Sequence, residues 1–301
     1  MSIAAFVKFW GTRGSIPTPG AGTRIYGGNT SCVEIRFGET LFICDAGSGI
    51  RGLGKDLLAR NPVPRELHLL ITHTHWDHIQ GFPFFDPCHR KDLRLNLYEP
   101  AGGDRSRHQL LSGQMSSAYF PVSFGDLGAE VVSHTLAAEG SVIGGVRVRS
   151  LALNHPGGCF GFIFQDEARK IAYITDNEIV PTAEDTFPDP EHAGKMRVIP
   201  PALLEHCAKA DLLICDAQYD DADYLRKKGW GHSSCSTVTD FAVQAGVRSL
   251  ALFHHDPEST DELVEQRVES CRRRAARHGA ELVIFAAREG LELKISPPRH
   301  G

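Results

Sequence analysis

The stretch Thr72-His73-Thr74-His75-Trp76-Asp77-His78 places three histidines and one aspartate within six residues. It follows the apolar run at residues 67–71, which predicts a buried strand. His73 and His75 share one face where that strand ends, because side chains two apart in an extended chain point the same way. Asp77 and His78 follow as the chain turns. Imidazole and carboxylate are the ligands that zinc and similar cations prefer, so this stretch predicts a metal site rather than a polar turn.

The spacing His-x-His-x-Asp-His resembles that of the metallo-β-lactamase superfamily. Three further ligand-type residues occur later in the chain, in the order that this family uses, and each follows a predicted strand: His155, Asp176 and His254. Taken one at a time, each of them could equally be an ordinary hydrogen-bonded side chain. The resemblance implies two divalent cations, the first bound by His73, His75 and His155, the second by Asp77, His78 and His254, with Asp176 bridging them. The mixed nitrogen and oxygen set favours zinc, with manganese or iron as alternatives.

The last ligand is ambiguous between two neighbours, His254 and His255. Adjacent side chains in a strand face opposite ways, so only one of them is expected to reach the metal. The family places its last ligand directly after the apolar strand, which favours His254. His255 is then expected to contact substrate or Asp256.

A further pair of residues, Asp216 and His232, indicates which class of bond the protein hydrolyses. Asp216 ends the apolar run at residues 212–215, and His232 precedes Ser233 and Ser234 at the start of a predicted helix. This arrangement resembles ribonuclease Z and related phosphodiesterases, in which an acidic residue pairs with a histidine of a His-Ser-Thr motif. A histidine that a carboxylate holds charged can give a proton to a departing alkoxide. The alternative is that His232 is only a residue at a helix start, with a neighbouring serine as the cap.

These features predict a hydrolase that cleaves a phosphodiester by metal-bound hydroxide, with Asp77 at the metals and His232, oriented by Asp216, as general acid. Family members that process transfer-RNA 3′ ends carry a long arm between the third histidine and the bridging aspartate. Residues 156–175 leave room only for a short strand pair, which disfavours that activity and favours a small or cyclic phosphodiester such as a cyclic nucleotide. The alternatives are a hydrolase of carboxylic esters, lactones or thioesters at the same metals, and a non-catalytic metal-binding module.

The amino-acid composition excludes few classes of protein. The chain has 301 residues, 42% hydrophobic and 23% charged, with a net charge of −5. This is an ordinary globular composition, and the charge gives no reason to expect a general nucleic-acid binder. The arginines at residues 272–274 and 277 lie on the polar face of a predicted helix and read as a solvated face. Eight scattered cysteines without a Cys-x-x-Cys pair, no leader pattern and no membrane-length apolar run favour a cytoplasmic protein. A homodimer is compatible with the sequence.

The expected fold is α/β: one domain over residues 1–301, an αββα sandwich of two mixed sheets with helices on the outer faces, as the resemblance implies. Helices are expected at residues 49–60, 79–85, 104–118, 201–208, 233–245 and 258–278. A surface loop is expected at residues 177–201. Asp45 has two interpretations, a residue behind the metals or a cap of the helix that follows it.

Overall fold

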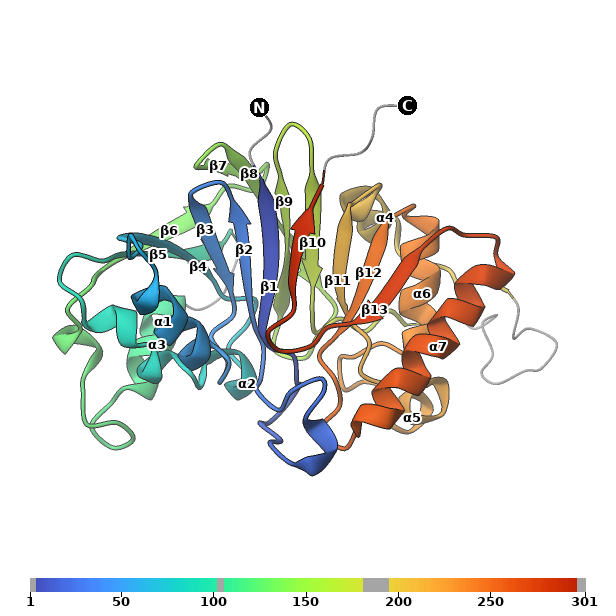
Figure 1. Cartoon of the computed structure of the whole chain (residues 1–301), viewed down its shortest axis with the longest axis horizontal. Helices are drawn as coiled ribbons and strands as arrows, with labels where there is room; N and C mark the ends of the chain where they lie inside the picture. Colours follow the sequence, from blue (N-terminus) through green and yellow to red (C-terminus); the bar gives the residue numbers. More distant parts are fainter. Residues whose placement is uncertain (1–3, 102–105, 181–194, 297–301) are drawn as a thin grey trace.

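Two seven-stranded sheets lie face to face between outer layers of helices in the computed structural model, which describes residues 4–101, 106–180 and 195–296 (Figure 1). The first sheet has the order β14-β1-β2-β3-β4-β5-β6, and the second has the order β13-β12-β11-β10-β9-β8-β7. The αββα class expected from the sequence is confirmed.

The first sheet combines the beginning of the chain with its last strand. Its strands are β1 (Ala5–Gly11), β2 (Cys32–Phe37), β3 (Thr40–Cys44), β4 (Glu66–Leu70), β5 (Arg94–Pro100), β6 (Glu130–Leu136) and β14 (Glu292–Ile295). β1, β2 and β3 pair antiparallel, whereas β3 to β6 run parallel. β14 pairs with β1, with Val7 opposite Leu293, so the end of the chain closes back onto the first sheet.

The second sheet begins with hairpins and continues with parallel strands. Its strands are β7 (Ser141–Ile143), β8 (Val146–Leu153), β9 (Cys159–Gln165), β10 (Lys170–Ile174), β11 (Leu212–Asp216), β12 (Ser249–Phe253) and β13 (Val283–Ala286). β9 and β10 form the short antiparallel pair expected between His155 and Asp176. β10 to β13 are parallel, so the residues that follow them meet at one edge of the sheet.

The fold has three buried apolar layers: one between the two sheets, and one between each sheet and the helices that cover it. β1 alternates buried and half-buried residues, and its inward side packs with Phe42, Phe164 and Tyr173 between the sheets. The helices α1 (Ile50–Ala59) and α3 (Arg107–Gln114) cover the outer face of the first sheet. The helices α4 (Pro201–Cys207), α6 (Cys235–Gln244) and α7 (Asp261–Arg277) cover the second sheet. Every layer therefore buries an apolar face, which is the main source of stability in such a fold.

Three local expectations differ from the structure. The helix expected at residues 79–85 is absent: α2 (Trp76–Ile79) lies inside the ligand motif and is followed by single turns at Phe82–Phe84 and Asp86–His89. Pro83 accounts for the break, because proline cannot donate the helical hydrogen bond and disfavours helical backbone in the residue before it. The helix expected at residues 104–118 is shorter, beginning after its cap Ser106. Residues 177–179 are buried rather than a surface loop, and residues 181–194 lie outside the described residues.

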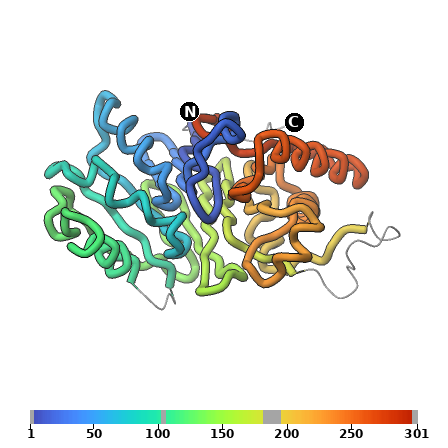
Figure 2. Tube along the Cα trace, turned by 90° about the horizontal axis from the view of Figure 1, so that it is seen from below, coloured from blue at the N-terminus to red at the C-terminus, as the bar shows by residue number. Residues whose placement is uncertain are grey.

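The loops at the carboxyl ends of the parallel strands gather at one edge of the sandwich, opposite the start of β1 and the end of β14 (Figure 1). Seen from that edge, the loop after β1 lies between the two halves of the molecule (Figure 2). Among the described helices, none has both the length and the apolar composition needed to cross a bilayer. All eight cysteines are buried free thiols, as expected of small apolar residues such as Cys44 and Cys215.

Candidate metal centre

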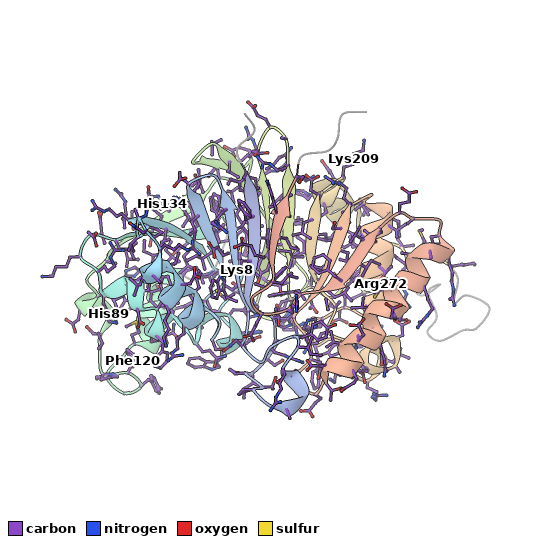
Figure 3. The ribbon with its side chains drawn as sticks, viewed as in Figure 1. Lys8, His89, Phe120, His134, Lys209 and Arg272 are labelled. Atoms are coloured by element: carbon purple, nitrogen blue, oxygen red, sulfur yellow. The ribbon has the colours of Figure 1, made fainter. Side chains whose placement is uncertain are left out.

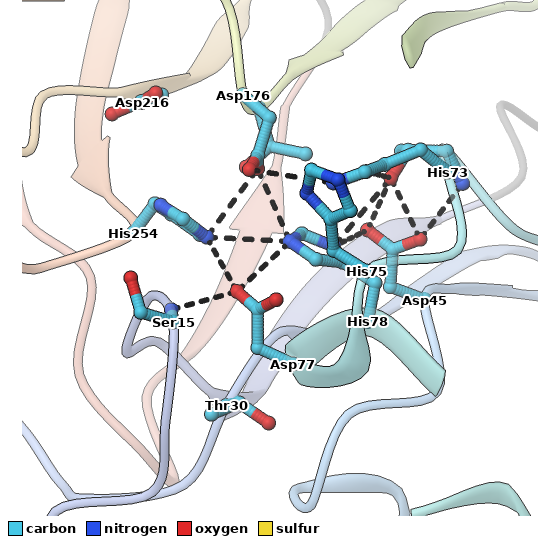
Figure 4. Close-up of polar contacts among 12 residues, drawn as sticks. Ser15, Thr30, Asp45, His73, His75, Asp77, His78, Asp176, Asp216 and His254 are labelled. Atoms are coloured by element: carbon cyan, nitrogen blue, oxygen red, sulfur yellow. Dashed lines mark hydrogen bonds and ion pairs between the residues drawn. The ribbon is translucent and has the colours of Figure 1, made fainter. Parts of the chain in front are cut away.

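The seven side chains expected to bind metal converge at this edge in two groups. One group contains His73, His75 and His155, and the other contains Asp77, His78, Asp176 and His254. Within each group the potential ligand atoms lie within 4.8 Å of one another. Figure 4 shows the contacts of the second group converging on Asp77, Asp176 and His254. The sequence separation between the loop at residues 73–78 and the later residues is therefore closed by the packing of the two sheets.

Asp176 lies between the two groups. Its Oδ1 atom is 3.2 Å from His78 Nε2 and 3.3 Å from His254 Nε2. Its Oδ2 atom is 3.6 Å from His73 Nε2 and 3.7 Å from His155 Nε2. Each carboxylate oxygen thus faces one group, which is the placement that a bridging ligand requires.

The free lone pairs of the histidines fit divalent cations. His73 Nε2 is buried and has no hydrogen-bond partner, and burial, with nearby His78, holds the pKa of His73 well below its usual value. His155 donates its Nδ1 proton to the Gly231 carbonyl oxygen at 2.9 Å, which leaves Nε2 facing His75 Nδ1 at 3.1 Å. Two nitrogens bound to one tetrahedral zinc at about 2.1 Å would lie about 3.4 Å apart. Neutral imidazoles at this spacing suit a metal ion.

Asp45 holds the loop at residues 73–78 in place through hydrogen bonds with Thr72 and His78. The carboxylate is fully buried and accepts hydrogen bonds from Thr72 N at 2.8 Å, His78 Nδ1 at 2.9 Å and Tyr173 Oη at 2.8 Å. The bond from Nδ1 turns the Nε2 lone pair of His78 toward Asp176. Gly49 precedes α1 and no side chain caps that helix, so of the two interpretations of Asp45 the structure supports the one behind the ligands.

Three residues that follow strand ends at the centre adopt left-handed backbone, namely Asp45 with φ 63°, Asp176 with φ 50° and His254 with φ 60°. Each comes one or two residues after the end of a strand. The left-handed turn stops the strand and bends the chain sharply where the side chain must reach the centre. Such conformations are unfavourable for residues other than glycine, and they concentrate at functional sites.

His254 and His255 have different surroundings. His254 Nε2 lies 3.1 Å from Asp77 Oδ2 and 3.3 Å from His78 Nε2, inside the second group. His255 is buried on the other side of the strand end, where its Nε2 donates to the Ala287 carbonyl oxygen at 2.9 Å. The expected preference for His254 agrees with this arrangement. The expected contact of His255 with substrate or Asp256 is wrong, because the ring packs edge-on against Tyr26.

His232 and Asp216 form a pair beside both groups. His232 Nδ1 donates to Asp216 Oδ2 at 2.7 Å, and Asp216 is fully buried at the end of β11. The His232 ring stacks on His254 with centroids 5.1 Å apart and lies 5.2 Å from the ring of His155. Burial lowers the pKa of His232, but the charge and hydrogen bond of Asp216, together with the charges of Asp176 and Asp77, raise that pKa to about 9. A protonated imidazole is thereby held at the edge of the centre.

A cavity of about 390 Å³ opens onto this edge. It is lined by Ser15, Thr74, His75, Trp76, Asp77, Asp176, His232 and His254. No lysine or arginine is among these lining residues, and Trp76, 64% exposed, is their one large apolar side chain. The aromatic residues around position 120 do not line it, and Figure 3 shows Phe120 on the flank of the first-sheet half.

Sequence reasoning missed Ser15 as a residue of the site. Its backbone N–H donates to Asp77 Oδ2 at 2.7 Å, and this contact is drawn in Figure 4. The Gly-rich loop after β1 was the available signal, since Gly14 packs so closely that a Cβ would lie 2.5 Å from the His254 ring.

Comparison with known proteins agrees with this geometry. Residues 40–255 match the family described as the beta-lactamase superfamily domain. The chain is 25% identical to a ribonuclease Z of Haloarcula marismortui, in an alignment that covers 97% of each protein. This match over nearly the whole length places ribonuclease Z higher among the candidate activities than the sequence analysis did.

Solved structures of other proteins have the same fold. The metallo-beta-lactamase fold protein YhfI of Bacillus subtilis superimposes with a TM-score of 0.67 and 15% identity, covering 97% of this chain and 99% of that one. The short form of human tRNase Z superimposes with a TM-score of 0.63 and 20% identity, again covering 97% and 99%. At these identities the similarity concerns the fold.

Proposed function

Because this chain belongs to the metallo-β-lactamase superfamily, in the branch that contains ribonuclease Z, and is a metal-dependent hydrolase, we propose that it hydrolyses a phosphodiester with His232 as general acid. The observation that carries the proposal is the place of His232. Its ring lies beside His155 of one ligand group and His254 of the other, and Asp216 orients it from behind. Cleaving an alkyl phosphodiester requires a proton for the departing alkoxide, and this imidazole can supply one.

We assign the first cation to His73, His75 and His155, the second to Asp77, His78 and His254, and a bridging role to Asp176. Zinc suits this ligand set best, with manganese or iron as alternatives. Two bound cations would supply an activated water and offset the negative charge of the phosphate. The protein itself fixes the ligand geometry, keeps His232 charged through Asp216 and orients Asp77 through the Ser15 amide.

The cavity favours a small substrate. Its lining offers His232 and the metal ligands to one phosphate, with no lysine or arginine for a second one. The exposed indole of Trp76 offers a flat apolar surface on which a nucleobase can stack. A cyclic nucleotide combines one phosphodiester charge with such a base, and it is the small substrate that we propose.

An RNA substrate is the second candidate, and the full-length similarity to ribonuclease Z favours it. Against it, the β9–β10 connection is a short turn without a long arm. The arginines of α7 are also partly engaged within the chain: Arg272 donates to the Ile284 carbonyl oxygen, and Arg274 pairs with buried Asp240. Figure 3 shows Arg272 on α7, in the outer layer of the second-sheet half.

The test compares substrates on the purified protein supplied with zinc or manganese. We expect turnover of bis(p-nitrophenyl) phosphate and of a cyclic nucleotide, and little turnover of a lactone or a thioester. A transfer-RNA precursor with a 3′ extension tests the second candidate. Cleavage of that RNA with no action on cyclic nucleotides would replace the small substrate by RNA. Preference for the lactone or thioester would overturn phosphodiester hydrolysis altogether.

The His232→Ala variant tests the role of the histidine. On an alkyl phosphodiester we expect a loss of about 10²- to 10⁴-fold in rate, the usual contribution of proton transfer. On the p-nitrophenyl ester the loss should be much smaller, because p-nitrophenolate leaves without a proton. Asp216→Asn should show a weaker form of the same pattern. Equal losses on both substrates would mean that His232 binds the phosphate instead, and no loss would make it structural.

A further inference from the structure

The segment that follows Asp176 is buried and is tied to the strand end that carries His155. Asn154 N donates to Asn177 Oδ1 at 2.9 Å, and Glu178 N donates to the Asn154 carbonyl oxygen at 2.8 Å. Glu178 is only 5% exposed, and a buried carboxylate is costly unless its oxygens accept several hydrogen bonds. This segment is therefore part of the site's framework.

The Glu178 carboxylate binds the loop in front of His232. Its Oε1 atom accepts from Tyr224 Oη at 2.9 Å and Gly229 N at 2.9 Å. Its Oε2 atom accepts from Gly229 N at 3.0 Å and Gly231 N at 3.0 Å. Both glycines have left-handed backbone, with φ 87° and 88°, which turns their amides toward the carboxylate. Hydrogen bonds to an ionised carboxylate are the stronger kind, so this contact fixes the loop.

The loop held by Glu178 contacts the centre through Gly231. The Gly231 carbonyl oxygen accepts the Nδ1 proton of His155 and so decides which nitrogen of that ring faces His75. A Cβ at Gly231 would lie only 2.2 Å from His155 Nδ1, so only glycine fits at this position against the ring. On the other side of His232, Ser233 Oγ donates to the Asn177 carbonyl oxygen at 2.6 Å and accepts from Ile179 N at 2.9 Å. His232 is thus clamped on both sides by residues 177–179.

We propose that Glu178 is a positioning residue for the reaction: by holding the amides of Gly229 and Gly231, it places His232 over the leaving group and His155 toward its cation. The inference rests on the proposed phosphodiesterase function and assigns a role to a residue outside the ligand set. Both oxygens take part, since Gly229 N donates to each of them, Tyr224 Oη donates to Oε1 and Gly231 N donates to Oε2. A glutamine at this position would turn an NH₂ group toward a backbone N–H. Some of the hydrogen bonds that hold the loop would then be lost.

The test uses Glu178→Gln in the full-length protein, with Glu205→Gln as the matched control. Glu205 is an exposed residue of α4, away from the cavity lining. We expect Glu178→Gln to lose about 10- to 100-fold in kcat on an alkyl phosphodiester, the range for residues that orient a metal site's ligands. The p-nitrophenyl ester should lose much less, since it does not need the proton of His232. Amide hydrogen exchange at Gly229 and Gly231 should become faster, and metal content should fall if His155 turns. The control should match the unmodified protein in all three measurements.

A second variant guards against a folding defect. Tyr224→Phe removes one donor but leaves the backbone amides in place, so it should change the ratio of the two rates in the same direction by a smaller factor. Equal losses on both substrates, or unchanged exchange at the glycine amides, would overturn the positioning role and leave Glu178 as a packing residue. A protein that cleaves neither phosphodiester overturns the proposed function instead, while amide exchange and metal content still test the clamp.

Discussion

The loop at residues 73–78 and the carboxyl edge of the second sheet supply the same centre in different ways. The loop brings four ligand-type side chains from a single turn around α2. The second sheet brings one side chain from each of several strand ends, at positions 155, 176 and 254. The loop ligands are therefore set mainly by local backbone, whereas the others depend on how strands pair and how the two sheets pack.

The support behind the two regions differs accordingly. A single buried carboxylate, Asp45, receives Thr72 and His78 from the loop and Tyr173 from the opposite sheet. In the second sheet, the hydrogen bonds of the Glu178 carboxylate join the segment after β10 to the loop before His232. Substitutions in the two regions should therefore impair the protein in different ways. Three experiments distinguish these effects.

The largest effect is expected in the loop. His78→Ala removes a fully buried imidazole that contacts both Asp77 and Asp176 and that we assign to the second cation, so activity should be lost and metal content should fall. Asp77→Ala should behave alike. Metal analysis and phosphodiester turnover measure both. His89→Ala is the control, an exposed histidine on the flank of the first-sheet half (Figure 3). Near-full occupancy of both metal positions in His78→Ala would contradict the ligand assignment.

At the second sheet, two adjacent histidines offer a matched pair. His254→Ala should lower metal content and activity, because His254 lies between Asp77 and Asp176. His255→Ala should keep the metals and instead lower the free energy of unfolding by about 1–3 kcal/mol, since it leaves the Ala287 carbonyl oxygen without its donor. Metal analysis and thermal unfolding distinguish the two variants. The reverse result would exchange the roles of these residues.

A smaller effect is expected behind the loop. Asp45→Asn keeps the size of the side chain but replaces one acceptor oxygen by an NH₂ group that faces donors. We expect metal affinity or activity to fall by about 10- to 100-fold, as is usual for partners of metal ligands. Titration with zinc and steady-state kinetics provide the measurement. Asp166→Asn, at the turn between β9 and β10, is the control. Unaltered zinc affinity and turnover in Asp45→Asn would mean that Thr72 and the packing around it suffice to hold the loop.

Local signals in the sequence were sufficient for the regular elements. The apolar runs before Asp45, Thr72, Asp216 and His254 became β3, β4, β11 and β12, because a buried strand requires a continuous apolar segment. The helix expected at residues 233–245 is also present, over Cys235–Gln244. The expectation at residues 177–201 failed where a contact distant in sequence decides, at Glu178 against the loop before His232, whereas the helix expected at residues 79–85 is interrupted by Pro83.

By itself, the sequence determined the ligand loop, the order of the later candidates and the pairing of an acid with His232. Spacing and residue type carry that information along the chain. Only the tertiary structure decided that His254 joins the centre while His255 bonds to Ala287, and that Asp176 faces both ligand groups. The physical reason is that a side chain's direction at a strand end depends on one left-handed residue and on the opposing sheet. The role of Glu178 has the same origin, since its partners lie some 50 residues further along the chain.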